Sequence, residues 1–259
     1  FQSLLGISFE DIFVVDSYSD DETLDIARGF TDKVIEHKFD NYSNQRNWAQ
    51  NNLPIKSEWV FHLDADERVT PKLAEELKRI FSNPDIKEDG FMVSRRTIFM
   101  DKWIRYGGHY PAYHLRLFKK NKGRCEERDY HQHFIVDGKV SILKNDILDI
   151  ISSDLTSMIE RHNKWISVEA RIFVQNKAEG EVKGKLFGTP IERRRWQRAC
   201  FYANMPLFVR PFLYFFYRYI IRLGFLDGAR GLIFHFLQGL WGFFLLDAKI
   251  YEYRMKKGK

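Results

Sequence analysis

The chain has 259 residues, 44% of them hydrophobic, so it suits one large domain or a domain with an appendage and is too apolar to be disordered. Its net charge of +6 is polarised: from Pro190 onward 13 Lys and Arg face 4 Asp and Glu, whereas the remainder has 28 against 31. The two cysteines exclude a disulfide framework and favour a reducing compartment.

Short apolar runs alternate with helical patterns in the first third of the chain. The runs at 11–16, 34–35 and 59–63 predict buried strands. A helical pattern follows each run. The first is expected to be capped by Ser19 with Glu22 in a capping box, and the third begins at Thr70-Pro71. This alternation predicts an α/β fold with a mostly parallel sheet flanked by helices.

The middle of the chain predicts further strands, then a long helix and a linker. Strands are expected at 90–97, at 113–119 as an edge or antiparallel strand, and at 138–143. An amphipathic helix is expected over 152–175. Residues 176–189, rich in glycine and lysine, predict a linker.

The last segment, 190–259, is basic and aromatic. Within the apolar stretch 211–223 and just before it, Arg210, Arg218 and Arg222 fall on one side of a helix. An arginine stripe opposite an apolar face predicts a helix in a membrane interface, with the arginines at anionic head groups. A buried helical pair and a homo-oligomer interface through the C-terminal helices are the alternatives. Nucleic acid is not expected as a partner, because aliphatic residues interleave the arginines.

Three acids in four residues follow the run at 59–63. Asp64 and Asp66 flank Ala65, a small residue that allows close approach of a ligand. Two carboxylates with phosphate oxygens are a usual way to hold Mg²⁺, and ligands gather at the carboxyl ends of strands in α/β sheets. The alternative is that these acids cap the next helix and face water.

Four motifs together resemble glycosyltransferase family 2, the nucleotide-sugar-dependent enzymes with the GT-A fold. They are VVDSYSDDET at 14–23, FDNYSNQRNWA at 39–49, LDADE at 63–67 and WIRYGGHYPAYHLRLFKKNKGRCEER at 103–128. The second and fourth are similar to the subgroup that builds bacterial lipopolysaccharide cores and exopolysaccharides. The resemblance implies a GT-A domain over 1–175 whose first strand is missing from this sequence.

The resemblance also implies site residues for a nucleotide-sugar donor, with a UDP-sugar favoured. Mn²⁺ or Mg²⁺ would be held by Asp66 and Asp64 on the donor diphosphate. The residues implied for donor binding are Asp16, Ser17, Asn44, Arg46, Asp64, Ala65 and Arg116. By resemblance Asn44, Gln45 and Arg46 form a donor-site loop, whereas chemistry alone indicates a polar helix start.

The family's inverting displacement requires a general base, and the stretch at 125–134 is the candidate region. Asp129 is the first choice, followed by Glu127, with His131 as a third because histidine titrates near neutral pH. The alternative for Glu127 is a surface ion pair with a neighbouring arginine.

Trp103, Arg105 and Tyr110 are the candidates for acceptor binding. Indole and phenol rings stack on sugars, and a guanidinium group suits acceptor anions. The alternatives are that the aromatic side chains belong to the core and that Arg105 is solvated.

The resulting hypothesis is an inverting, metal-dependent glycosyltransferase. It would act on a lipid-linked or cell-envelope glycan acceptor, peripherally at the cytoplasmic face of the bacterial inner membrane. The alternative is a catalytically degenerate GT-A domain that serves as a membrane-bound partner in polysaccharide assembly. A nucleotidyltransferase is disfavoured, because no glycine- and lysine-rich phosphate loop occurs near the N-terminus.

Overall fold

The computed structural model describes residues 2–4, 9–128, 132–151, 154–175, 181–198, 200 and 204–257. The chain forms two compact units. Unit 1 consists of Phe1–Asp64, Arg68–Val93 and His114–Asp146, and unit 2 of Ala65–Glu67, Ser94–Tyr113 and Ile147–Lys259.

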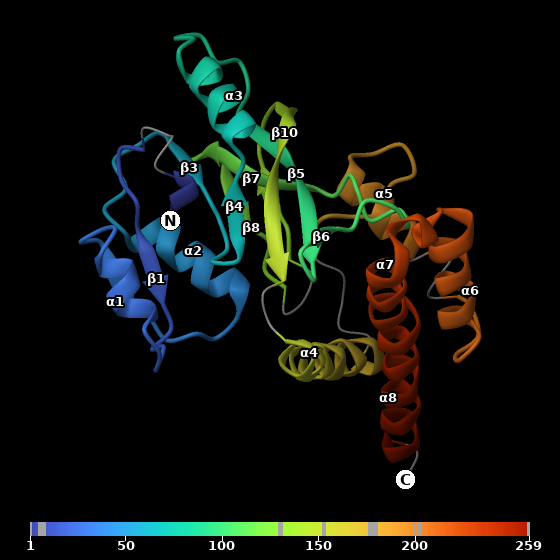
Figure 1. The fold of residues 1–259 in the computed structure, drawn as a ribbon. Helices are drawn as coiled ribbons and strands as arrows, with labels where there is room; N and C mark the ends of the chain where they lie inside the picture. Colours follow the sequence, from blue (N-terminus) through green and yellow to red (C-terminus); the bar gives the residue numbers. More distant parts are fainter. Residues whose placement is uncertain are drawn as a thin grey trace. The chain divides into compact units, whose positions relative to one another are not determined.

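The first part of the chain alternates strands and helices, as predicted (Figure 1). After a short 3₁₀ turn at Gln2–Leu4, the elements are β1 (Val14–Asp16), α1 (Thr23–Arg28), β2 (Val34–Glu36), α2 (Tyr42–Asn52), β3 (Trp59–Phe61), β4 (Glu67–Val69) and α3 (Pro71–Phe81). The following strands are β5 (Gly90–Phe99), β6 (Lys102–Trp103), β7 (Tyr113–Lys119), β8 (Gly123–Cys125), β9 (Phe134–Val136) and β10 (Val140–Ile151).

Helices make up most of the remaining described chain. They are α4 (Leu155–Gln175), α5 (Pro190–Gln197), α6 (Arg210–Phe216), the π-helical η3 (Tyr217–Ile221), the 3₁₀ turn η4 (Gly224–Asp227), α7 (Gly228–His235), the π-helical η5 (Phe236–Trp241) and α8 (Gly242–Lys257). Figure 1 shows α7 and α8 continuing one another as one long helix.

The described strands form three sheets. β1 and β2 pair in parallel, with Asp16 opposite Glu36, and β8 and β9 pair antiparallel. The six-stranded sheet has the order β3-β7-β5-β10-β4, and β6 pairs with β5. The strand predicted at 113–119 is β7, and it is antiparallel to β3, with Val60 opposite Phe118.

The structure confirms the predicted cap of α3 but not that of α1. The Thr70 hydroxyl accepts a hydrogen bond from Leu73 N at 3.2 Å, and Pro71 occupies the first turn of α3. Thr70 is therefore the cap of α3, and the acids at 64–67 are not. The predicted cap of α1 is wrong: Ser19 Oγ donates to Asp16 Oδ1 at 2.6 Å, because the charged carboxylate is the stronger acceptor.

Several strands differ from the sequence prediction. The short strands β4, β6, β8 and β9 were not expected, and β10 continues to Ile151, well past residue 143. Polar residues at 144–146 interrupt the apolar pattern, so the sequence did not predict the second half of β10. Contacts from α3 stabilise the strand at these residues. The buried Glu76 carboxylate accepts from the backbone N of Lys144 and Asn145, each at 2.9 Å.

Unit 2 contains two apolar clusters and a set of buried charges. One cluster consists of Phe99, Ile104, Met158 and Phe234, and the other of Ile166, Ala170, Leu246 and Ile250. The prediction that Arg210 and Arg218 meet lipid head groups is wrong, since their exposed fractions are 1% and 8%. Arg210 Nε donates to the buried Asp247 at 2.8 Å, and Arg218 Nε donates to Gly107 O at 3.0 Å. Burial costs less for arginines with such partners than for unpaired charges.

Candidate donor site

Asp64 follows β3 in unit 1 and lies between two arginines from other elements. Arg46 Nη2, on α2, donates to Asp64 Oδ1 at 2.6 Å, and Arg116 Nη2, on β7, donates to Oδ2 at 2.7 Å. The pairing of β3 with β7 brings Arg116 there, because His62 N donates to Arg116 O at 2.9 Å. The structure thus brings together three residues predicted for the donor site, and we call them the carboxylate–diarginine cluster.

The electrostatics of this cluster favour the charged form of Asp64. Burial alone raises the pKa of a carboxyl group, but Arg116 and then Arg46 outweigh it and hold the pKa of Asp64 well below its ordinary value. The Asp64 side chain remains 38% exposed, whereas that of Arg116 is only 6% exposed. The cluster is therefore a charged assembly with one partly open side, as a site for an anionic ligand requires.

His62 lies next to the cluster and was not singled out from the sequence. Its ring lies near the rings of Phe118 and Phe134, with centroids 5.4 and 4.5 Å away, and its Nε2 is buried without a hydrogen-bond partner. Burial first, then the charges of Arg46 and Arg116, lower the pKa of His62 to about 3. The only sign of this residue in the sequence is that it is polar and stands inside the otherwise apolar run at 59–63.

Replacing His62 with phenylalanine is expected to reduce the acid sensitivity of the fold. The folded protein keeps this ring neutral down to about pH 3, whereas the unfolded chain protonates it below about 6.5. The unfolded state therefore gains stability as the pH falls through this window, by about 2 kcal/mol at about pH 5, and nothing is gained above pH 6.5.

The measurement is the free energy of unfolding in urea between pH 5 and about pH 8 for both proteins. Their difference should change with pH only below 6.5. Parallel curves for wild type and His62→Phe would rule out this assignment.

A second polar group forms where β1 ends. The buried Asp16 accepts from Ser19 N at 2.8 Å and from its hydroxyl, and these bonds outweigh burial and lower the pKa of Asp16. Gln45 on α2 donates to Ser17 Oγ at 3.2 Å and contacts His37 Nδ1 at 2.7 Å. Gln45 belongs to the predicted donor-site loop with Asn44 and Arg46. It links the ends of β1 and β2 to α2, the helix that carries Arg46.

Three other residues predicted for the donor site, Asn44, Ala65 and Asp66, are all exposed. Asn44 N donates to the cap residue Asn41 at 2.9 Å, so Asn44 contributes to the start of α2. Ala65 and Asp66 belong to unit 2, where Ile150 N donates to Asp66 O at 3.0 Å.

The residue types fit a divalent cation only with help from a ligand. Within the described residues, no group of three or more His, Cys, Asp or Glu side chains is placed to hold a metal ion. Asp64 and Asp66 supply carboxylates, and Mg²⁺ commonly takes one or two of these with substrate phosphates and water. A metal at these residues would therefore need the donor diphosphate to complete its coordination.

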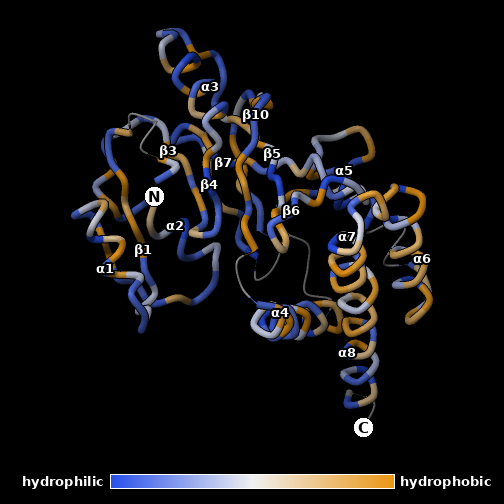
Figure 2. Tube along the Cα trace, viewed as in Figure 1, coloured by the Kyte–Doolittle hydropathy of each residue, from blue (hydrophilic) through white to orange (hydrophobic). Residues whose placement is uncertain are grey.

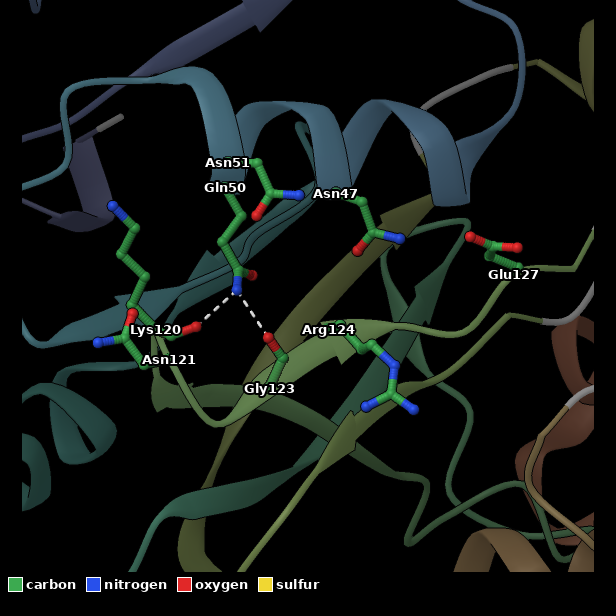
Figure 3. A pocket seen from close by; sticks show the side chains of 8 residues that line it. All are labelled: Asn47, Gln50, Asn51, Lys120, Asn121, Gly123, Arg124 and Glu127. Atoms are coloured by element: carbon green, nitrogen blue, oxygen red, sulfur yellow. Dashed lines mark hydrogen bonds between the residues drawn. The ribbon is translucent and has the colours of Figure 1, made fainter.

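A polar pocket of about 480 Å³ lies between α2 and the β7–β8 turn (Figure 3). Its lining residues are Asn47, Gln50, Asn51, Lys120, Asn121, Gly123, Arg124 and Glu127. Gln50 Nε2 donates to the carbonyls of Lys120 and Gly123 at 2.8 and 2.6 Å, which closes one side. The exposed Glu127 is thus on the pocket wall, whereas the other two base candidates, Asp129 and His131, lie outside the described residues.

The three acceptor candidates belong to unit 2. The rings of Trp103 and Tyr110 meet edge to face with centroids 5.0 Å apart. The Arg96 and Arg105 guanidinium carbons lie 4.6 and 5.4 Å from the centroid of the Trp103 ring. The structure brings these candidates together, but two arginines already contact the Trp103 ring.

Comparison with known proteins identifies the family. The model of glycosyl transferase family 2 matches residues 2–150, more than half of the chain, so the chain belongs to this family and its α/β fold is of the GT-A type. The motif order predicted this membership, which is confirmed.

Curated relatives agree with the family and differ in how much they align. An uncharacterized glycosyltransferase of Rickettsia bellii is 32% identical over 74 residues, 29% of this chain and 24% of that protein. The lipopolysaccharide core biosynthesis glycosyltransferase LpsC of Rhizobium meliloti is 23% identical over 188 residues, 70% of this chain and 68% of the relative. The glycosyltransferase SunS of Bacillus subtilis is 39% identical over 61 residues, 22% of this chain and 14% of SunS. The chain thus spans about a quarter of the length of the first relative, by its 24% coverage.

Proposed function

We propose that the chain is an inverting, metal-dependent glycosyltransferase that uses a nucleotide-diphosphate sugar. The observation that carries this proposal is the carboxylate–diarginine cluster of Arg46, Asp64 and Arg116 in a chain of family 2. Arg46 on α2 and Arg116 on β7 both contact the partly exposed carboxylate of Asp64, which follows β3. The Arg116 side chain is nearly buried whereas the Asp64 side chain is 38% exposed, so the charged cluster keeps one side open to a ligand.

The cluster suits a diphosphate for electrostatic reasons. Guanidinium groups present a planar fork that matches two phosphate oxygens, and Arg46 and Arg116 are already oriented by Asp64. A divalent cation at Asp64 and Asp66 would neutralise the charge that develops on the departing nucleotide diphosphate. Asp16 and Ser17 would contact the base or ribose, with a UDP-sugar as the favoured donor.

Inversion requires the acceptor oxygen to form a bond to the anomeric carbon as the bond to the diphosphate oxygen breaks. The hydroxyl proton passes to a carboxylate or imidazole, for which the candidates are Asp129, Glu127 and His131. Exposure of Glu127 on the wall of the polar pocket supports it as a base that an acceptor can reach.

The acceptor is proposed to be a lipid-linked or cell-envelope glycan at the cytoplasmic face of a bacterial inner membrane. The similarity to LpsC, a lipopolysaccharide core biosynthesis glycosyltransferase, and the excess of cations after Pro190 support this. In the part of the chain that the structure describes, one helical stretch, Gly224–Lys256, is long and apolar enough to cross a membrane. Such a stretch is weak support by itself, because buried helices of soluble proteins share these properties.

Donor turnover tests the proposal. The purified chain, with Mn²⁺ and a panel of nucleotide sugars, should bind one donor and release its nucleotide diphosphate, faster when an envelope lipid extract is present. Chelation of the metal should stop release. If no nucleotide sugar binds with or without metal, the enzyme proposal fails and the degenerate partner in polysaccharide assembly takes its place.

A further inference from the structure

A continuous apolar face lies on the outside of α6, η3 and η4. Its side chains recur at helical spacing and then continue through the next turn, and their exposed fractions lie between 42% and 58%. The members of this apolar face are Val209, Phe212, Leu213, Phe216, Tyr217, Ile220, Ile221, Leu223, Phe225 and Leu226. Figure 2 shows hydrophobic residues along α6 and α7. Soluble monomers rarely expose so many adjacent apolar side chains.

The opposite side of the same segment packs inside unit 2 through aromatic rings and two buried arginines. Arg210 is bound to Asp247, and Arg218 donates to the carbonyl of Gly107. Because this inner side already supplies the contacts of the segment within unit 2, the apolar face remains available to a partner outside unit 2.

Residues of η3 and η4 also form hydrogen bonds with residues 102–107. Asp227 accepts from the backbone N of Arg105 and Tyr106 at 3.3 and 2.9 Å, and Lys102 Nζ donates to Asp227 O at 2.6 Å. Gly107 N donates to Arg222 O at 2.9 Å. These contacts attach the segment with Trp103 and Arg105 to η3 and η4.

Gly107 allows this attachment because it has no side chain. Its φ is +69°, and a Cβ there would lie 2.2 Å from the buried ring of His235. A larger residue would push residues 102–107 away from α7. The close approach shows that the position of this stretch depends on the C-terminal helices.

Charge and length indicate that the partner is a lipid surface. Twelve residues of helix from Arg210 to Ile221 rise about 18 Å, which is too short to cross a hydrocarbon core of about 30 Å but suits a helix in the plane of the interface. Arg222 and Arg230 are exposed beside the apolar face, within a region of 13 Lys and Arg against 4 Asp and Glu. A second copy would bring this positive charge together, whereas anionic lipids neutralise it.

We propose that α6, η3 and η4 form an in-plane anchor in an anionic membrane interface, and that lipid binding steadies residues 102–107. Asp227 and Arg218 act as positioning residues between the anchor and this stretch. The anchor rests on the structure of unit 2, and only the role of residues 102–107 at a lipid-linked acceptor rests on the proposed function. The anchor reverses the arginine orientation predicted from the sequence.

Flotation with lipid vesicles tests the anchor. The full chain should float with vesicles of phosphatidylcholine and phosphatidylglycerol, and less with phosphatidylcholine alone. Phe216→Ser with Ile220→Ser should lower the partition coefficient at least about tenfold, because two large side chains lose their burial in lipid. The control is Ile26→Ser with Ile142→Ser, two apolar residues of unit 1 with exposed fractions of 53% and 49%.

Equal flotation of the two double variants would overturn the anchor. So would light scattering that shows a dimer without vesicles which Phe216→Ser with Ile220→Ser dissociates, because the apolar face would then bind a second copy. Neither readout uses donor or transfer, so the anchor stands or falls separately from the enzyme proposal.

Hydrogen exchange tests the coupling to residues 102–107. Anionic vesicles should slow exchange of the Arg105, Tyr106 and Gly107 amides in the wild type, and should have no effect in the Phe216→Ser, Ile220→Ser variant. Gly107→Ala, outside the anchor, should bind vesicles as the wild type does but lose the protection of the Arg105 and Tyr106 amides, because its Cβ would displace this stretch from the His235 ring. Unchanged exchange of these amides in vesicle-bound wild type would overturn the coupling.

Discussion

Asp64→Asn is expected to lower sugar transfer at least about 100-fold and to destabilise the fold by about 2 kcal/mol. The amide cannot balance two guanidinium groups, and the nearly buried Arg116 loses the ion pair with Asp64. Partial solvent exposure of the Asp64 side chain, 38%, keeps the stability loss below that of a fully buried pair. Steady-state transfer and urea unfolding measure the two effects.

Asp66→Asn is the matched control, because Asp66 is an exposed carboxylate two residues away. It should leave the free energy of unfolding within about 0.5 kcal/mol of wild type. If Asp66 holds the metal, its variant should also lose transfer and require more Mn²⁺. Wild-type transfer by Asp64→Asn would remove the cluster from the donor site.

Asp247→Ala is expected to destabilise the protein by about 3–5 kcal/mol. Asp247 and Arg210 are 0% and 1% exposed, and Asp247 Oδ2 also accepts from Phe208 N at 2.8 Å. The change leaves a guanidinium charge and a backbone amide without this acceptor. The loss should appear as a lower urea midpoint with an unchanged slope.

A surface ion pair of the same helix is the control. Glu252→Ala breaks the exposed Lys256–Glu252 pair and should leave the urea midpoint close to that of the wild type. Combining Asp247→Leu with Arg210→Met should recover much of the stability lost in Asp247→Ala, because neither charge of this buried pair remains. Equal losses in Asp247→Ala and Glu252→Ala would contradict the importance of this pair.

Sequence motifs located part of the candidate site but not its contacts. Asp64 was conspicuous as an acid directly after an apolar run, and Arg46 and Arg116 were chosen by resemblance. That both arginines contact the same carboxylate follows from the pairing of β3 with β7 and from the packing of α2. His62 was missed, because its importance lies in neighbours distant in sequence.

The sequence by itself determined the features that depend on neighbouring residues. Thr70 and Pro71 start α3, alternating runs form the first strands and helices, and the motif order identifies the family. Tertiary structure alone decided which side of α6 and η3 is buried. Periodicity shows that a helix has two unlike faces, but the partners of Arg210 and Arg218 decide which one turns inward. Those partners, Asp247 and Gly107, lie 37 and 111 residues away, beyond the reach of any local pattern.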